Sequence, residues 1–118
     1  MAAQVEAVLI ETTQLEQLKE FYKSGFELDE PDTSESDQVG FQIGSVYFGL
    51  EQVDEVTAAS GAMSLWFKVD DASATYERLI ECGARSKDAP SQIEDETIAS
   101  VFDPDGNTIG LLSDRPVE

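Results

Sequence analysis

The sequence predicts an α+β fold in which two tandem βαβββ modules form a curved mixed sheet around a cleft. Two observations lead to this prediction. Segments with strand and helix periodicity follow one another in the same order in both halves of the chain, and each half closes with two strands around a tight turn. Because independent errors of assignment would not coincide, the repeat supports each element. One helix covers only one face of a sheet, so we expect the paired modules to curl around a shared cleft.

In the first half, aliphatic residues open the chain, and the capping-box pattern Thr13-Gln14-Leu15-Glu16 precedes a helical apolar face. Gly25 supplies a C-cap that ends this helix, and Gly44-Ser45 supplies the turn of a hairpin. We therefore expect a strand at 5–10, a helix after residue 13, a short strand at 26–28, a polar acidic loop at 29–37 and hairpin strands at 39–43 and 46–51.

The second half repeats this order. Asp70-Asp71 can cap a helix that Gly83 closes, and Gly106 supplies the positive φ of a hairpin turn. The stretch from Asp103 also begins like a calcium loop, but Thr108 stands where such a loop needs glycine, so we favour the turn. We expect a strand at 64–69, a helix after residue 71, a short strand at 84–86, a polar loop at 87–90 and hairpin strands at 97–102 and 107–112.

Length and composition fit one domain with a substantial core, because the chain has 118 residues and a normal globular share of hydrophobic residues, 41%. We assign residues 4–52 to the first module, 53–62 to a linker of small residues and 63–113 to the second module. No segment is long and apolar enough to span a bilayer, and the N-terminus lacks the pattern of a signal peptide. We therefore expect a cytoplasmic protein. The single cysteine, Cys82, can form no internal disulfide.

Acidic residues dominate the charge, with 25 Asp and Glu against 7 Lys and Arg and a net charge of −18. Such a surface repels phosphates and anionic lipid, which excludes nucleic acid and membranes as partners. The acidic residues are spread along the chain and lysine is scarce, which favours adaptation to a salt-rich cytosol over an acidic face for a cationic ligand. This halophilic interpretation predicts loss of the fold at low salt.

Four segments in their order and spacing carry a resemblance to a known family: LEQLKEFYKSGF at 15–26, FKVDD at 67–71, YERL at 76–79 followed by Cys82-Gly83, and FDPDGN at 102–107. Together they resemble the vicinal oxygen chelate superfamily, which includes glyoxalase I, bleomycin-resistance proteins and extradiol dioxygenases. The resemblance covers nearly the whole chain. It implies the paired βαβββ fold, with a binding cleft between the modules.

The resemblance also implies four positions at which family enzymes hold a divalent metal with His, Glu or Gln. They fall on Ala7, Gly49, Ser64 and Gly110, none of which is a usable ligand, and the chain has no histidine. Because isomerisation of the glyoxalase type and extradiol cleavage both need a metal, we expect neither the usual chemistry nor a cofactor. A hard cation on carboxylate oxygens stays an alternative, with Glu11 or Glu51 facing inward or with Glu6 brought there by a one-residue register slip.

Strand alternation predicts which side chains share the cleft with these positions. Small residues at the former ligand positions, surrounded by aromatic and aliphatic side chains, suit a planar organic ligand stacked on Trp66 or Tyr47, or a cleft filled by its own side chains. Trp66 can equally be a core or dimer contact, and Lys68 a surface ion pair. The predicted cleft residues are Ala7, Leu9, Tyr47, Gly49, Glu51, Ser64, Trp66, Lys68, Thr108 and Gly110.

These features predict a metal-free relative that binds a small organic molecule, in the manner that the resemblance to bleomycin-resistance proteins implies. Two alternatives remain: a metal-dependent lyase, isomerase or dioxygenase with carboxylate ligands, and a non-catalytic dimerisation module. We expect a homodimer in each case, because open sheet faces and edges are seldom left bare.

Overall fold

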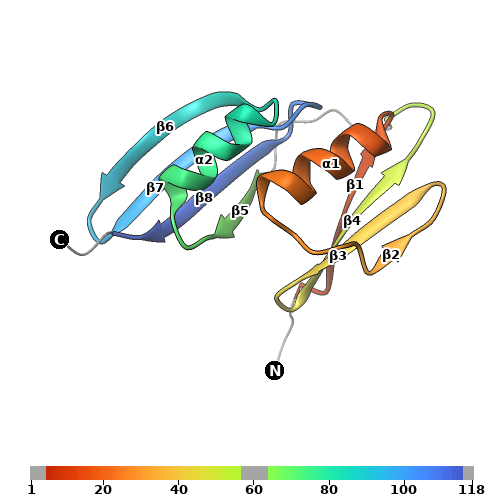
Figure 1. Ribbon diagram of the computed structural model, residues 1–118, viewed down its shortest axis with the longest axis horizontal. Helices are drawn as coiled ribbons and strands as arrows, with labels where there is room; N and C mark the ends of the chain where they lie inside the picture. Colours follow the sequence, from red (N-terminus) through yellow and green to blue (C-terminus); the bar gives the residue numbers. More distant parts are fainter. Residues whose placement is uncertain (1–4, 57–63, 116–118) are drawn as a thin grey trace. The chain divides into compact units, whose positions relative to one another are not determined.

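The computed structural model describes residues 5–56 and 64–115, and the chain divides into two compact units, Met1–Ala59 and Ser60–Glu118. Each unit has one main helix lying on one face of a four-stranded mixed sheet (Figure 1). The two βαβββ modules of the predicted α+β fold are therefore present. Most of the predicted linker at 53–62 lies outside the described residues.

The first sheet has the strand order β1-β4-β3-β2, with β1 parallel to β4 and the other pairs antiparallel. Its register sets Leu9 opposite Gly49, and Gly49 opposite Gly40. These three residues therefore form one row across the sheet. The elements of this unit are β1 (Ala7–Thr12), α1 (Leu15–Gly25), β2 (Thr33–Ser34), β3 (Gln38–Ile43) and β4 (Val46–Gln52).

The second sheet repeats this topology as β5-β8-β7-β6, again with one parallel pair, β5 and β8. Its register sets Trp66 opposite Gly110, Gly110 opposite Ser100, and Ser100 opposite Asp88. These four residues form the row equivalent to that of Leu9 in the first sheet. The elements are β5 (Ser64–Lys68), α2 (Ala72–Glu81), β6 (Arg85–Ile93), β7 (Glu96–Phe102) and β8 (Thr108–Asp114).

In each unit the core lies between the helix and the sheet. Alternation along the strands turns one set of apolar side chains toward the helix. In the first unit, Tyr22 of α1 packs edge-on against Phe48 of β4 with ring centroids 4.8 Å apart. In the second unit, Leu79 of α2 and Leu111 of β8 are fully buried, and Ser113 accepts a hydrogen bond from the backbone N–H of Ala72 at the start of α2.

Two predicted elements were wrong. Residues 26–28 do not form a strand: residues 26 and 27 form a turn directly after α1, in which Glu27 takes a positive φ of 54°. The short strand of this unit is β2, which lies inside the predicted acidic loop. The predicted loop at 87–90 belongs to β6, which is nine residues long. Register shifts on either side of Asp88 let this polar, exposed strand stay paired with β7, so its sequence lacks regular alternation.

The helix starts also differ from each other. Asp71 caps α2 as predicted, its carboxylate accepting a hydrogen bond from the N–H of Ala74 at 3.1 Å. The capping box predicted at Thr13 is absent, because α1 begins after Gln14 without a side-chain cap from its own segment. Instead the amide oxygen of Gln52, at the end of β4, accepts a hydrogen bond from the N–H of Leu15 at 2.9 Å.

The Asp-Pro-Asp-Gly segment is a hairpin turn, as expected, and Asp103 organises it from the inside. Asp103 is almost fully buried, and one of its carboxylate oxygens accepts hydrogen bonds from the N–H groups of Asp105 and Asn107, each at 2.9 Å. The other oxygen accepts from the side-chain amide of Asn107 at 2.9 Å. Gly106 adopts a φ of 91°, which a side chain would strain.

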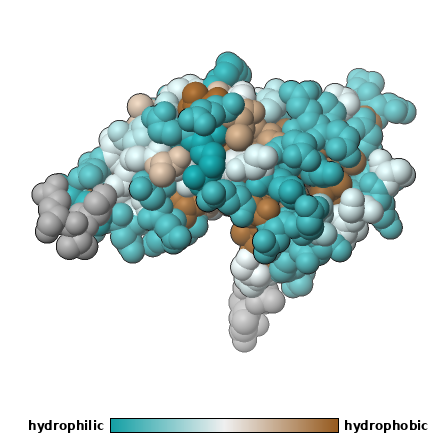
Figure 2. Space-filling view, viewed as in Figure 1, coloured by the Kyte–Doolittle hydropathy of each residue, from teal (hydrophilic) through white to brown (hydrophobic). Residues whose placement is uncertain are grey.

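Hydrophilic residues cover most of the visible surface (Figure 2), as the net charge of −18 requires. Neither α1 nor α2, the two helices of the described segments, has the length or apolarity that crossing a bilayer requires.

Candidate functional site

Each sheet has a second face, on the side away from its helix, which we call the helix-free face. The register places Leu9 and Gly49 on this face of the first sheet, and Trp66 and Gly110 on this face of the second. The residues predicted for the cleft all lie on helix-free faces, and each set is brought together within its own unit; their role in binding stays a prediction. The first set is Ala7, Leu9, Tyr47, Gly49 and Glu51, and the second is Ser64, Trp66, Lys68, Thr108 and Gly110.

The indole of Trp66 lies flat over Gly110. A Cβ built on Gly110 would come within 2.1 to 2.3 Å of three carbon atoms of the indole ring, a separation that real Cβ atoms do not show. The indole N–H donates a hydrogen bond to the hydroxyl of Ser64 at 3.1 Å. This bond fixes the direction in which the indole N–H points. Trp66 is nevertheless 51% exposed, so the outer face of the ring is available for stacking.

The first sheet uses its glycines in the same way. A Cβ on Gly40 would lie 1.8 Å from the hydroxyl oxygen of Tyr47, and a Cβ on Gly49 would lie 2.5 Å from a methyl carbon of Leu9. The phenol ring therefore extends across Gly40, and Leu9 covers Gly49 while remaining 59% exposed. Gly49 and Gly110, at which the resemblance implies metal ligands, are thus covered by apolar side chains of the same sheet.

A pocket of about 320 Å³ adjoins Trp66 on the helix-free face of the second sheet. Ile98 and the 54% exposed Ile93 provide aliphatic walls, and the polar side is formed by Ser100, whose hydroxyl donates a hydrogen bond to Asp88 at 3.0 Å. The pocket therefore offers a flat aromatic surface, an apolar wall and a single carboxylate. Its lining residues are Trp66, Asp88, Ala89, Ser91, Ile93, Ile98, Ala99 and Ser100.

Of these lining residues, only Trp66 was predicted. Ile98 and Ser100 lie on a strand that the sequence did predict, and they share the face of Trp66 through β8, so the pairing order β5-β8-β7 was the missing information. Asp88 and Ile93 could not be found from the pattern, because their strand, β6, lacks regular alternation and was partly assigned to a loop.

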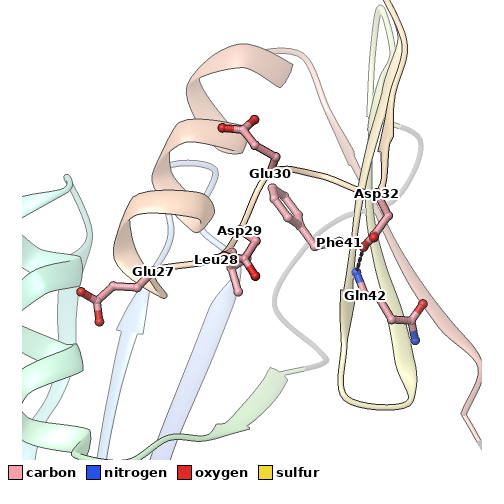
Figure 3. Close-up of a pocket in the computed structure, with 7 residues that line it drawn as sticks. All are labelled: Glu27, Leu28, Asp29, Glu30, Asp32, Phe41 and Gln42. Carbon is pink, nitrogen blue, oxygen red and sulfur yellow. Dashed lines mark hydrogen bonds between the residues drawn. The ribbon is translucent and has the colours of Figure 1, made fainter.

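A second pocket, of about 280 Å³, lies in the first unit beside the loop that follows α1. Four of its lining residues are acidic, but their carboxylates do not converge: Glu27 and Glu30 point in different directions, and Asp32 turns to the backbone N–H of Gln42, from which it accepts a hydrogen bond at 2.7 Å (Figure 3). This divergent arrangement does not form a cation site. The lining residues are Glu27, Leu28, Asp29, Glu30, Asp32, Phe41 and Gln42.

The chain's own residues do not fit the metal that the resemblance implies. Neither Gly49 nor Gly110 can carry a ligand while Leu9 and Trp66 cover it. On the helix-free face of the first sheet, Glu11 and Glu51 lie opposite each other, whereas the register turns Ala7 rather than Glu6 to this face. Segments 5–56 and 64–115 contain no group of three or more His, Cys, Asp or Glu side chains placed to hold a metal.

The sequence matches the family described as "Glyoxalase-like domain" over residues 7–112. The chain belongs to this family. Its place in the vicinal oxygen chelate superfamily, inferred above from four segments, is thereby confirmed. No curated protein matches the chain.

Solved structures related to the glyoxalase-like domain family share the fold. A glyoxalase-related enzyme from Fulvimarina pelagi has a TM-score of 0.83 and 21% identity, covering 94% of this chain and 88% of that one. A glyoxalase/bleomycin resistance protein from Albidiferax ferrireducens T118 has a TM-score of 0.80 and 21% identity, covering 97% and 100%. Fosfomycin resistance protein FosX from Mesorhizobium loti has a TM-score of 0.73 and 21% identity, covering 96% and 92%. Identities this low support the common fold and leave the activity open.

Proposed function

We propose that this glyoxalase-like protein binds a small organic molecule on the helix-free face of its second sheet, and that it does so without a metal ion. The observation that carries the proposal is the indole of Trp66 lying flat over Gly110 with half of its surface exposed. A large aromatic side chain fixed by a hydrogen bond and left uncovered is a stacking surface for a planar ring.

The pocket beside Trp66 supports the same ligand class. Its volume of about 320 Å³ exceeds that of a two-ring aromatic compound, and binding sites for small molecules combine apolar walls with a few placed polar groups. Ile93 and Ile98 supply the walls, while Ser100 and Asp88 supply the polar groups. A ligand held in this way needs no bond to a metal.

The first test uses the fact that Trp66 is the only tryptophan of the chain, so its indole N–H gives a single, assignable NMR signal. We expect naphthalene-2-carboxamide, a neutral planar probe, to shift this signal in a saturable titration and to raise the melting temperature in molar KCl. Trp66→Ala should abolish the melting shift. Val56→Ala, at an exposed apolar residue of the first unit outside the predicted cleft, is the control and should retain it.

The metal-dependent alternative is tested separately. Metal analysis of the purified protein should find no stoichiometric metal, and added Mn²⁺, Ni²⁺, Zn²⁺ or Fe²⁺ should leave the melting temperature unchanged. A stoichiometric metal, or a melting shift that disappears in Glu11→Gln and Glu51→Gln, would show that the neighbouring carboxylates of the first sheet hold an ion and would overturn the metal-free proposal.

We infer in addition that the chain forms a homodimer. Large apolar side chains are exposed in the first unit, among them Val5 and Leu9, and solvated apolar groups favour association. Sedimentation equilibrium in molar KCl should give twice the chain mass of 12.9 kDa, and a monomer at micromolar concentration would contradict the inference.

A further inference from the structure

Two basic side chains of β6, Arg85 and Lys87, lie over the same aromatic ring. The guanidinium carbon of Arg85 is 5.1 Å from the ring centroid of Phe102, and the ammonium nitrogen of Lys87 is 6.0 Å from it. Arg85 and Phe102 are partners in the register of β6 and β7. Both basic residues are exposed, so this is a patch of positive charge at the surface of the second sheet, which we call the basic pair.

The basic pair is unusual in a chain with 25 acidic and only 7 basic residues. Lys19, Lys23 and Lys68 each reach a carboxylate within 4.0 Å. Neither Arg85 nor Lys87 forms such a pair with a described residue. Two like charges side by side repel each other, so with carboxylates in excess an internal partner would be expected.

Stacking on Phe102 alone does not explain this arrangement. A cation over an aromatic ring at an exposed site gains only a modest free energy, and the second cation adds repulsion from the first. An anion bound between the two would remove that repulsion. The flat guanidinium of Arg85 matches the two oxygens of a carboxylate or phosphate, while the ammonium of Lys87 adds a point charge.

The basic pair also lies beside the Trp66 pocket. Phe102 and Ser100 are two residues apart on β7, so their side chains lie on the same face of the sheet. Ser100 belongs to the row across the sheet that also contains Trp66, Gly110 and Asp88. By ordinary sheet spacing, Phe102 is two strands across and one row along from Trp66, roughly 12 Å between backbones. A two-ring aromatic molecule that carries an acidic group can span this separation.

We propose that the basic pair binds the anionic group, a carboxylate or a phosphate, of a planar aromatic ligand whose rings lie against Trp66. This assignment rests on the proposed function and adds the charge of the ligand to it. Asp88 lies in the same pocket and repels such a group, so its hydrogen bond from Ser100 is the contact that holds this carboxylate in place. The overall negative charge repels anions as well, and a local basic pair opposes this repulsion at close range.

The test compares three probes of the same shape and different charge: naphthalene-2-carboxylate, naphthalene-2-carboxamide and naphthalene-2-carboxamidine. Calorimetry gives each affinity, and the indole N–H signal of Trp66 confirms that each binds at this site. We expect the carboxylate to bind about fivefold more tightly than the carboxamide, and the amidine to bind most weakly. 2-Naphthyl phosphate tests whether the anionic group of the ligand is a carboxylate or a phosphate. If it binds more tightly than naphthalene-2-carboxylate does, we assign the anionic group as a phosphate.

Variants identify the residues responsible. Arg85→Gln and Lys87→Gln should each weaken carboxylate binding about fivefold while leaving carboxamide binding unchanged, which also shows that the pocket is intact. Lys23→Gln makes the same change of charge in the first unit, where Lys23 pairs with Glu30 at 3.2 Å, and should change nothing. Asp88→Asn removes a repulsive charge and should strengthen carboxylate binding.

The outcomes separate this inference from the proposed function. The assignment of an anionic ligand would be overturned if the three probes bound with equal affinity. It would also be overturned if the amidine bound most tightly and Asp88→Asn abolished the binding of the amidine. Either result would leave the proposed function standing. No shift of the Trp66 signal with any probe would overturn the proposed function and this inference with it.

Discussion

Gly49 and Gly110 lie at two positions where the resemblance implies a metal ligand, and each also leaves space for a neighbouring side chain of the same sheet. An alanine at Gly110 would already place an atom 2.1 Å from the indole of Trp66, so no other residue fits while the ring lies flat. Gly49 and Leu9 have the same relationship in the other sheet. The two residues of each pair therefore depend on each other: the glycine leaves space above the sheet, and the large apolar side chain occupies it.

This interdependence gives the first prediction. Gly110→Ala should displace the indole and lower the free energy of unfolding by about 1 kcal/mol, since lost ring packing outweighs the gain from removing a flexible glycine. In a Trp66→Ala background the same substitution should be neutral or stabilising, because the obstructing ring is gone. Urea unfolding of the four proteins in this double-mutant cycle measures the coupling. Additive effects of the two substitutions would show that the ring does not cover the glycine.

Asp103 shows how a residue can resemble a metal ligand and serve only the fold. Its two carboxylate oxygens are occupied by two backbone N–H groups and one side-chain amide of its own turn. Asp103→Ala should lower the free energy of unfolding by about 2–4 kcal/mol, because buried donors lose a charged partner. Asp95→Ala removes the same charge at an exposed turn and should stay within about 0.5 kcal/mol, as chemical denaturation can check. Similar effects of the two substitutions would contradict this role.

At the scale of elements, the two helices show what a single sequence can and cannot predict. The cap of α2 was predictable, because Asp71 is adjacent in sequence to the helix that it caps. The partner of the α1 terminus was not, because Gln52 is 37 residues away from Leu15 and joins it only through the parallel pairing of β1 and β4. Thr13 fits the local pattern equally well, but the fold places the Gln52 amide at the helix start.

This difference gives a prediction that compares three variants. Gln52→Ala should lower the free energy of unfolding by about 1 kcal/mol, the usual cost of a lost helix cap, whereas Thr13→Ala should stay within about 0.5 kcal/mol. Asp71→Ala provides the reference for a conventional cap on α2 and should also lower it by about 1 kcal/mol. Thermal unfolding ranks the three. A larger loss of stability for Thr13→Ala than for Gln52→Ala would support the predicted capping box instead.

The same distinction between local and distant information explains the strands. Regular alternation predicted the paired hairpin strands and the side chains of their faces. It failed for β2, which is two residues long, and for β6, whose register shifts break the alternation. These are also the strands at one edge of each sheet, where one neighbour rather than two constrains the sequence. The pocket residues Asp88 and Ile93 were missed because they lie on such an edge.

For the whole molecule, the excess of negative charge is the dominant feature. Only a few carboxylates reach a lysine in the described segments, and the acidic partners in those pairs are between 61% and 86% exposed, so each pair contributes little. Elsewhere carboxylates stand beside one another. Glu94, Asp95 and Glu96 are consecutive and exposed at the turn between β6 and β7. Their repulsion opposes the compact state and falls as salt screens it.

The last prediction follows from this repulsion. The melting temperature should rise steeply with KCl up to about 1 M, where the Debye length falls to about 3 Å, and the protein should unfold when salt is removed. Sucrose also stabilises compact states but does not screen charge, so it should not replace KCl at low salt. The triple variant Glu94→Gln, Asp95→Asn and Glu96→Gln removes one cluster of like charges and should make the dependence on KCl shallower. If the triple variant and the unmodified chain depend on KCl equally, or if sucrose restores the fold as well as KCl does, then repulsion between carboxylates does not govern stability and the acidic surface needs another explanation.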